Sequence, residues 1–249
     1  MDAIDSYFGE IKNILERVLE TQKEAMQKAA HALSDAAISG KSIFAFGCSH
    51  AGLLALELYY RSSGMALINP IRAPGLNLDV DPASVTSEME RLPGYGRIII
   101  DSQPIKKDDV IIIHSVSGRN PVTVDVALRS KEIGAYVIAL TSMAASVLKS
   151  RHESGKSLYQ VADLVIDNCG ALGDGALTVP GVDEKVAPTS TAVGAAILNA
   201  VMAQAVSYIA DAGELPPVFV SANLDSGDAH NKEIMQKYGD RIYYMGFKK

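Results

Sequence analysis

The pattern of hydrophobic and polar residues predicts one long helix followed by alternating strands and helices. Apolar residues recur every three or four positions over residues 2–39, which is the period of a helix with one buried face, and Gly40 marks its end. Short apolar runs then alternate with helical patterns. The predicted strands are 42–47, 110–114, 136–140 and 164–166, with minor strands at 65–68, 98–100 and 218–220; the predicted helices are 53–61, 121–133, 191–210 and 229–238.

Strands that are apolar along their whole length indicate a sheet that is covered on both faces. The run Val110-Ile111-Ile112-Ile113 shows no alternation of polar and apolar residues. Such strands, separated by helices, are typical of a parallel sheet at the centre of a three-layer α/β/α sandwich. Ligands of this fold class bind beyond the carboxyl ends of the strands, near the point where the strand order reverses. The residues after each strand are therefore the first candidates for a functional site.

The 249 residues fit one large α/β domain, with 48% hydrophobic and 21% charged residues. The formal charge is -6 and no long basic run occurs, so a nucleic-acid partner is not expected. The N-terminal segment lacks the pattern of a signal peptide, and no apolar run is expected to approach the ~20 residues that span a bilayer. Two cysteines form no metal motif. We therefore expect a cytoplasmic protein with no membrane partner.

The domain organisation follows from the same pattern. We expect a single domain over 1–249, divided into an N-terminal helical arm at 1–40, an α/β core at 41–225, and a C-terminal helix and tail at 226–249. Two segments, 69–97 and 168–188, are long for loops, and loops of this length are often functional. The glycine-rich second segment is interpreted either as a lid or as a surface excursion. The first helix either covers one face of the domain or also contributes to a dimer contact.

Hydroxyl groups follow several predicted strands at points where helices begin. The turns are Gly47-Cys48-Ser49-His50-Ala51-Gly52, Ser115-Val116-Ser117-Gly118-Arg119-Asn120-Pro121 and Thr141-Ser142, and Thr189-Ser190 precedes the long late helix. Small residues let the backbone approach a ligand, and a helix N-terminus offers N–H groups and a positive dipole end. Each turn alone is also explained as a capped turn. Their recurrence favours a phosphate site built without lysine; the dinucleotide and Walker A patterns are both missing.

These turns together resemble the sugar isomerase (SIS) domain family, over roughly residues 30–225. The family includes the isomerase half of glucosamine-6-phosphate synthase, phosphoheptose isomerase and N-acetylmuramic acid 6-phosphate etherase. The segments 152–156 (His-Glu-Ser-Gly-Lys) and 221–231 resemble those of a bacterial branch of this family whose members are sometimes named as phosphoheptose isomerases. The resemblance implies a small phosphorylated sugar as ligand and a homodimer or homotetramer. The substrate-binding residues that follow from the turns and the resemblance are Cys48, Ser49, Ser115, Ser117, Gly118, Asn120, Thr141, Ser142, Thr189 and Ser190.

The catalytic residues are inferred from the same resemblance. Aldose–ketose isomerisation needs a positioned base and an acid. Family members often carry a glutamate on the helix after the first turn, for which Glu57 is the nearest candidate, and the etherase branch has an acid in the region of Glu88. A solvated or salt-bridged Glu57 is the alternative. His50 and His230 are candidate proton carriers, and His230 is also a candidate to reach a neighbouring subunit. His114 ends a core strand and is interpreted as a core histidine.

The sequence favours an isomerase or lyase that acts on a sugar phosphate or an amino-sugar phosphate. The long late helix lacks the histidine that phosphoheptose isomerases tend to carry there, which counts against that exact activity. The alternative is a non-catalytic sensor or regulatory protein, since SIS domains also serve in transcription regulators. No cofactor and no metal are expected, because no local ligand spacing requires one. A reactive Cys48 at a helix N-terminus is a further alternative.

Overall fold

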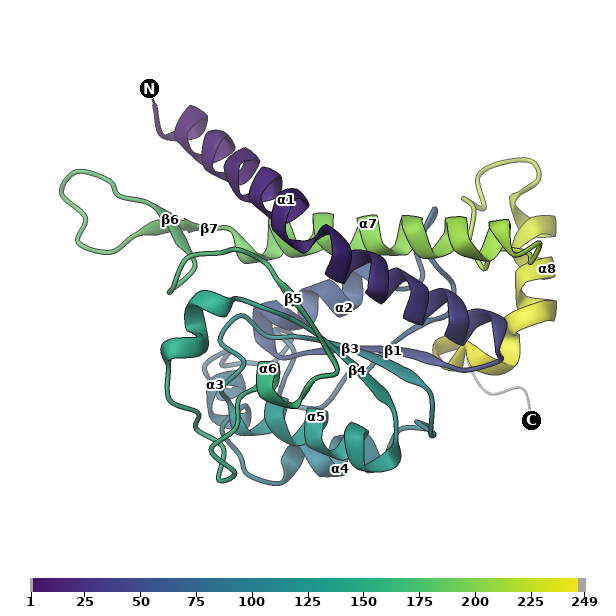
Figure 1. The fold of residues 1–249 in the computed structure, drawn as a ribbon, viewed down its shortest axis with the longest axis horizontal. Coiled ribbons are helices and arrows are strands. Elements are labelled where there is room, and N and C mark those ends of the chain that lie inside the picture. The colour runs from purple at the N-terminus through teal and green to yellow at the C-terminus, as the bar shows by residue number, and fades with distance from the viewer. Residues whose placement is uncertain (1, 246–249) are drawn as a thin grey trace.

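The computed structural model describes residues 2–245 and confirms the three-layer α/β/α architecture (Figure 1). At its centre is a five-stranded parallel sheet with the order β2-β1-β3-β4-β5. Its strands are β1 (Ile43–Gly47), β2 (Ile68–Pro70), β3 (Val110–His114), β4 (Tyr136–Thr141) and β5 (Leu164–Asp167). The chain leaves β1 toward one side for β2 and returns to the other side for β3. The strand order therefore reverses between β1 and β3, where this fold class binds ligands.

Helices cover both faces of the sheet. One face carries α1 (Ala3–Ile38), α2 (Gly52–Leu58) and α7 (Ser190–Asp211), and α8 (Gly227–Tyr238) packs into the same core cluster near the end of α7 (Figure 1). The other face carries α4 (Tyr95–Asp101) and α5 (Pro121–Ile133), with the short α3 (Val85–Met89) and α6 (Leu158–Val161) beside them. Successive residues of a strand point to opposite faces of the sheet, and a separate hydrophobic core lies on each face. Ile112 packs with the α1–α7 layer, whereas Ile111 and Ile113 pack with the α4–α5 layer.

The long helix α7 lies in the core layer beside α1. Within residues 2–245 it is the one helix long and apolar enough to cross a membrane, by length and composition alone. This finding corrects the expectation that no apolar run comes near that length. The buried positions Val193, Ile197 and Val201 belong to the same core cluster as Ile14 and Val18 of α1. The apolar composition of α7 is thus used, at least along this face, for packing against α1.

Three predicted strands differ from the structure. Residues 98–100 lie in helix α4, with Ile99 and Ile100 buried and Ile98 exposed. A short apolar run cannot distinguish a strand from a buried helix, and here packing against α5 selects the helix. The strand predicted at 65–68 is shifted to Ile68–Pro70. In place of a strand at 218–220 there is an isolated antiparallel bridge between Met65 and Val218.

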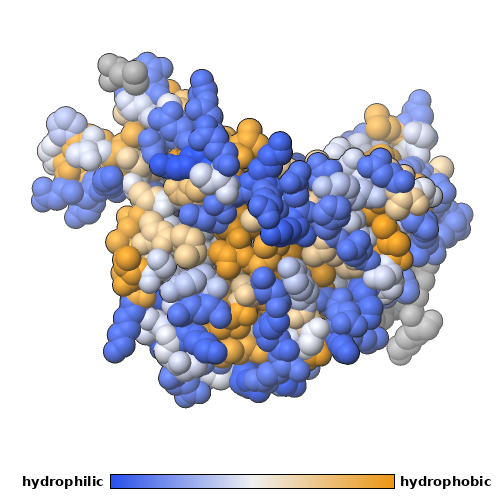
Figure 2. All heavy atoms as spheres, viewed as in Figure 1, coloured by the Kyte–Doolittle hydropathy of each residue, from blue (hydrophilic) through white to orange (hydrophobic). Residues whose placement is uncertain are grey.

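The segment predicted as a long glycine-rich loop contains a small antiparallel hairpin. Its strands are β6 (Gly175–Leu177) and β7 (Val186–Pro188). The hairpin projects from the body beside the first turns of α1 (Figure 1), and the Tyr7 hydroxyl donates a hydrogen bond to the Pro188 carbonyl oxygen at 2.8 Å. Figure 2 shows the outward face of α1 as largely hydrophilic, while hydrophobic side chains gather below it.

The last residue of β3, His114, has a buried side chain, as expected for a core histidine. Its Nδ1–H donates to the Ala51 carbonyl oxygen at 3.0 Å, and its Nε2 has no hydrogen-bond partner within the described part of the chain. Burial lowers the pKa of His114 to about 4, partly offset by the bond to Ala51 and the charge of Asp174. The imidazole is therefore neutral at pH 7 and ties the turn after β1 to the end of β3.

We expect the folded state to lose stability as the pH falls from about 6.5 to about 4. The unfolded histidine takes up a proton near pH 6.5, whereas folded His114 resists protonation down to about pH 4. This difference in proton uptake is worth roughly 3 kcal/mol over that range. In a His114→Gln variant, denaturant unfolding at several pH values should give a shallower pH dependence by about this amount. The control His31→Gln, an exposed position on α1, should keep the steeper dependence; equal slopes in both variants would contradict the assignment.

We also expect Gly96→Ala to be strongly destabilising. An added Cβ at Gly96 would lie 2.5 Å from Asp125 Cβ and 2.9 Å from Val126 N, because α4 and α5 approach closely there. Overpacking of this kind costs about 1–3 kcal/mol. The control Gly9→Ala adds a Cβ to helix α1 where nothing lies within 4 Å, so it should stabilise the fold by about 1 kcal/mol. Urea unfolding checks both values, and a neutral Gly96→Ala would refute the close approach.

Candidate functional site

A cavity of about 520 Å³ opens at the carboxyl ends of β1, β3 and β4, on the side of the sheet where the strand order reverses. This volume is typical of sites for small ligands. Its lining residues come from the turns after β1 and β3, from Glu90, and from the segments after β4 and β5: Cys48, Ser49, His50, Ala51, Glu90, Ser115, Val116, Ser117, Asn120, Ser142, Ala145, Leu148, Ala171, Leu172, Gly173 and Asp174. Seven of the residues predicted from the sequence line this one cavity: Cys48, Ser49, His50, Ser115, Ser117, Asn120 and Ser142.

The turn after β1 is tight and fixed by its glycines. An added Cβ on Gly47 would lie 2.5 Å from the Ala51 carbonyl oxygen, so this position accepts no side chain. Ser49 has a positive φ of 51° and its N–H donates to the Leu76 carbonyl oxygen at 2.7 Å. His50 is exposed at the rim of the cavity. Burial, together with the nearby charge of Glu90, raises the pKa of the Cys48 thiol, which opposes the reactive thiolate considered from the sequence.

The turn after β3 is shaped by Gly118, which has a positive φ of 58°. The Ser115 hydroxyl oxygen accepts a hydrogen bond from Gly118 N at 3.1 Å, while Ser117 lines the cavity. Asn120 occupies the N-cap position of α5, and Pro121 is the first helical residue, as the sequence predicts. The Asn120 side chain makes no cap hydrogen bond, however. It is directed to other side chains, which leaves the helix N-terminus without a side-chain cap.

The carboxylate of Glu90 joins the two turns. Ser49 Oγ donates to Glu90 Oε1 at 2.7 Å, and Asn120 Nδ2 donates to Glu90 Oε2 at 2.7 Å. The side chain lines the cavity, and two directional bonds fix its orientation. The sequence pattern does not single out Glu90 and predicts the acid of this region at Glu88, which is exposed on α3. The two glutamates are two positions apart at a helix end, so only the orientation of that helix distinguishes them.

Three of the predicted catalytic residues lie outside the cavity. Glu57 on α2 forms an ion pair with Arg61 and accepts a bond from Asn199 Nδ2 at 3.3 Å, an arrangement that resembles the salt-bridged alternative. His230 on α8 has its Nε2 2.8 Å from the Val218 carbonyl oxygen. Glu88, as noted, is exposed. Of the four catalytic candidates only His50 lines the cavity, and catalytic roles for the other three remain predictions.

Several predicted hydroxyl ligands are bonded within the protein. Thr141 Oγ1 donates to the Val116 carbonyl oxygen at 3.2 Å, and Ser142 Oγ donates to the Gly170 carbonyl oxygen at 2.8 Å. These bonds connect the turn after β4 to its neighbours. The hydroxyls therefore support the walls of the site, and their contact with a ligand remains a prediction.

Thr189 and Ser190 are both bonded to Asp174, a residue for which the sequence pattern gives no functional signal. One of its carboxylate oxygens accepts hydrogen bonds from Thr189 N at 3.0 Å, Thr189 Oγ1 at 3.1 Å and Ser190 N at 2.8 Å, and the other accepts from Ser190 Oγ. Asp174 therefore caps the start of α7 from the segment before the hairpin. It also lines the cavity, so it fixes one wall of the site to the core helix.

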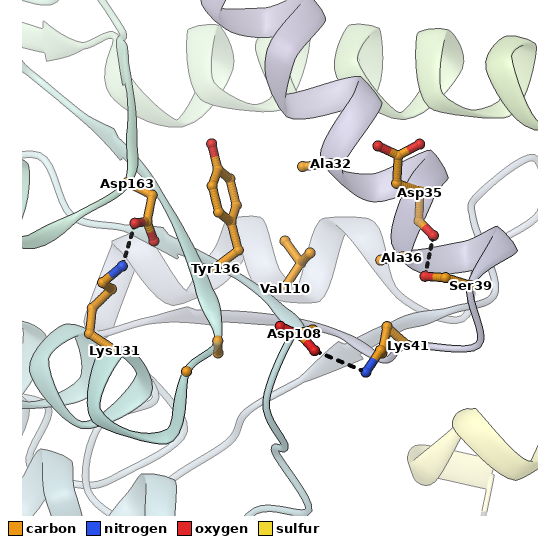
Figure 3. Close-up of a pocket in the computed structure, with 12 residues that line it drawn as sticks. Ala32, Asp35, Ala36, Ser39, Lys41, Asp108, Val110, Lys131, Tyr136 and Asp163 are labelled. Atoms are coloured by element: carbon orange, nitrogen blue, oxygen red, sulfur yellow. Dashed lines mark hydrogen bonds and ion pairs between the residues drawn. The ribbon is translucent and has the colours of Figure 1, made fainter.

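A second cavity, of about 370 Å³, lies at the opposite edge of the sheet, near the amino ends of β3 and β4 (Figure 3). Its two lysines are paired with carboxylates: Lys41 Nζ lies 3.4 Å from Asp108 Oδ2, and Lys131 pairs with Asp163. Because both lysines are paired and Asp35 adds a third carboxylate to the lining, this cavity is a weaker candidate for an anionic ligand. Over residues 2–245, no group of three or more His, Cys, Asp or Glu side chains is arranged to hold a metal ion.

Comparison with known protein sequences connects this geometry to a family. The SIS domain model matches residues 6–142. A UPF0309 protein of Shouchella clausii is 45% identical over 246 residues, which is 98% of this chain and 100% of the relative. A UPF0309 protein of Geobacillus thermodenitrificans is 46% identical over 240 residues, 96% of each chain.

Solved structures share the fold at low sequence identity. A phosphoheptose isomerase from Francisella tularensis matches with a TM-score of 0.53 and 15% identity, over 82% of this chain and 98% of that one. A protein of E. coli CFT073, solved as a complex, matches with a TM-score of 0.50 and 18% identity, over 82% and 92%. At such identity the likeness establishes the fold alone. With the family model and the relatives at 45% and 46% identity, it follows that this chain belongs to the SIS domain family, among the bacterial UPF0309 proteins.

Proposed function

We propose that this protein binds a phosphorylated sugar in the cavity between β1, β3 and β4 and acts on it as an aldose–ketose isomerase or a related lyase. The observation that carries the proposal is the Glu90 carboxylate, held on both oxygens by Ser49 and Asn120 where two phosphate-type turns meet. A base fixed in this way inside a ligand-sized cavity is what proton abstraction from a bound sugar requires. The solved relatives of this fold include a phosphoheptose isomerase.

The turn after β3 supplies the donors for the phosphate group. Ser115 and Ser117 line the cavity, and the N-terminus of α5 follows immediately without a side-chain cap. Helix N-termini and backbone N–H groups bind phosphate well, and a protein with net negative charge needs such local donors. A phosphate held here places the sugar chain within the same cavity as Glu90.

The chemistry then consists of proton transfers between adjacent atoms. As an isomerase, Glu90 would remove the proton from the carbon next to the carbonyl and return it to the former carbonyl carbon, through an enediol. A second group must move the proton between the two oxygens, and His50 at the rim is the candidate. As a lyase, the same proton abstraction would be followed by departure of a group from the next carbon. Both reactions use one base in one position.

We expect Glu90→Gln to reduce kcat by a factor of about 10²–10⁴, the usual contribution of a general base. Because the amide keeps the size of the side chain and its capacity to accept from Ser49, KM should change much less. The measurement is turnover of the best sugar phosphate from the binding screen below. Glu88→Gln, two residues away and exposed, is the matched control and should retain full activity. Full activity in Glu90→Gln would contradict the assignment of Glu90 as the base. The same would follow if Glu57→Gln caused the loss of activity and Glu90→Gln did not.

A binding screen tests the ligand class. We expect fructose 6-phosphate, sedoheptulose 7-phosphate or glucosamine 6-phosphate to raise the melting temperature when its parent sugar does not. A ligand at 100 times its Kd adds about 2.7 kcal/mol of stability, which corresponds to a shift of roughly 5–10 °C for a chain of this length. The double variant Ser115→Ala/Ser117→Ala should lose most of the shift. Binding without turnover would favour the sensor alternative, and no shift with any sugar phosphate would overturn the proposal.

A further inference from the structure

Three arginines gather beside the Glu90–Asn120 pair. Arg91 directly follows Glu90, and Arg119 directly precedes Asn120. Arg151 reaches the same place from the segment after β4: its N–H donates to the Arg119 carbonyl oxygen at 2.9 Å, and its Nη1 donates to Asn120 Oδ1 at 3.0 Å. We call Arg91, Arg119 and Arg151 the arginine cluster. It adjoins two residues that line the cavity, Glu90 and Asn120.

The cluster has no carboxylate partner of its own within residues 2–245. The arginines that form ion pairs within 4.0 Å in this part of the chain lie elsewhere: Arg61, Arg97, Arg129 and Arg241. Arg119 Nε is buried and has no hydrogen-bond partner among the described residues. Burial and the charges of Arg119 and Arg91 lower the pKa of Arg151, with Glu90 opposing them. Unpaired guanidinium groups gather here although the chain has 29 acidic and 23 basic side chains.

The positions of these arginines are set by buried contacts around Asp125. Asp125 Oδ1 lies 3.1 Å from His152 Nε2, and both side chains are only 6% exposed. The other oxygen, Oδ2, accepts a hydrogen bond from Gly94 N at 2.8 Å. Asp125 thereby anchors both the segment that carries Arg151 and the turn that follows Arg91.

The 150–156 segment is also braced by its own side chains. Ser150 Oγ donates to the Lys156 carbonyl oxygen at 2.7 Å, and His152 Nδ1 lies 2.7 Å from Ser154 Oγ. The His-Glu-Ser-Gly-Lys motif at 152–156 therefore forms a rigid support that presents Arg151 next to Asn120. Within the described part of the chain, this segment bonds to the turn after β3 through Arg151, which donates to the Arg119 carbonyl oxygen and to Asn120.

We propose that the arginine cluster binds a second anionic group, a carboxylate or a phosphate, on the ligand, in addition to the phosphate held by the turn after β3. Guanidinium groups pair with both anions through two parallel hydrogen bonds, so a preorganised cluster selects for a charged end. This inference rests on the proposed function and narrows it: the natural ligand is a sugar phosphate or sugar-acid phosphate with two anionic ends.

Two matched pairs of probes test the second anion by calorimetry. 6-Phosphogluconate and sorbitol 6-phosphate differ only in a carboxylate, and fructose 1,6-bisphosphate and fructose 6-phosphate differ only in a phosphate. In at least one pair, we expect the probe with an anionic group at both ends to bind at least about tenfold more tightly than its partner. In Arg151→Gln and Arg119→Gln this preference should fall to near one, while the Kd of the singly phosphorylated member stays within about twofold. Arg129→Gln, with the same charge change at the distant end of α5, should leave the preference intact.

The outcomes separate the two proposals. If sorbitol 6-phosphate or fructose 6-phosphate binds and neither charged partner binds more tightly, the second-anion site is refuted and the sugar-phosphate site stands. If both variants weaken all four probes equally, the cluster contacts the first phosphate and the inference is wrong. If the preference persists unchanged in both variants, the charge is recognised elsewhere and the inference is again wrong. If none of the four probes binds, the inference is wrong, and the proposed function fails with it if no sugar phosphate raises the melting temperature.

Discussion

The in-register pairing of β1, β3 and β4 is the constraint on which the site depends. Gly47 pairs with His114, and His114 pairs with Leu140, so three strands end at the same level of the sheet. Both faces of these strands are buried under helices, which fixes the register because a slip of one residue would turn every side chain to the opposite face of the sheet. The turns that follow the strands therefore meet at one edge, and their polar groups converge without any long-range attraction between them.

Local patterns in the sequence were enough to predict this arrangement in outline. The unbroken apolar run at 110–113 indicates a strand buried on both faces. The turn from Ser115 to Asn120 can then be predicted to lie at the carboxyl end of that strand. The triplet 98–100 was predicted wrongly, since periodicity over three residues carries no information about helix or strand. There the choice was made by packing against α5, a contact between segments distant in sequence.

Side-chain direction marks the limit of what the sequence could tell about the site. Glu90 and Glu88 have the same chemistry, and only the orientation of the short α3 turns the first toward the cavity and the second toward solvent. Thr189 and Ser190 look like phosphate ligands in the sequence, yet both donate to Asp174. Hydroxyl groups in such a turn either bind a ligand or form hydrogen bonds within the protein. The number of hydroxyl groups in the sequence therefore overstates the contacts available to a ligand.

The hydrogen bonds between Asp174 and the start of α7 hold the two ends of the β6–β7 hairpin segment together. The hairpin leaves and returns at the same carboxylate, so the residues between form a closed excursion whose ends are fixed independently of its length. The cost of lengthening such a loop grows only slowly with the number of added residues. The exposed tip at 180–185 is accordingly a place where evolution can lengthen the chain, or an engineer can insert a whole domain, while the cavity keeps its shape.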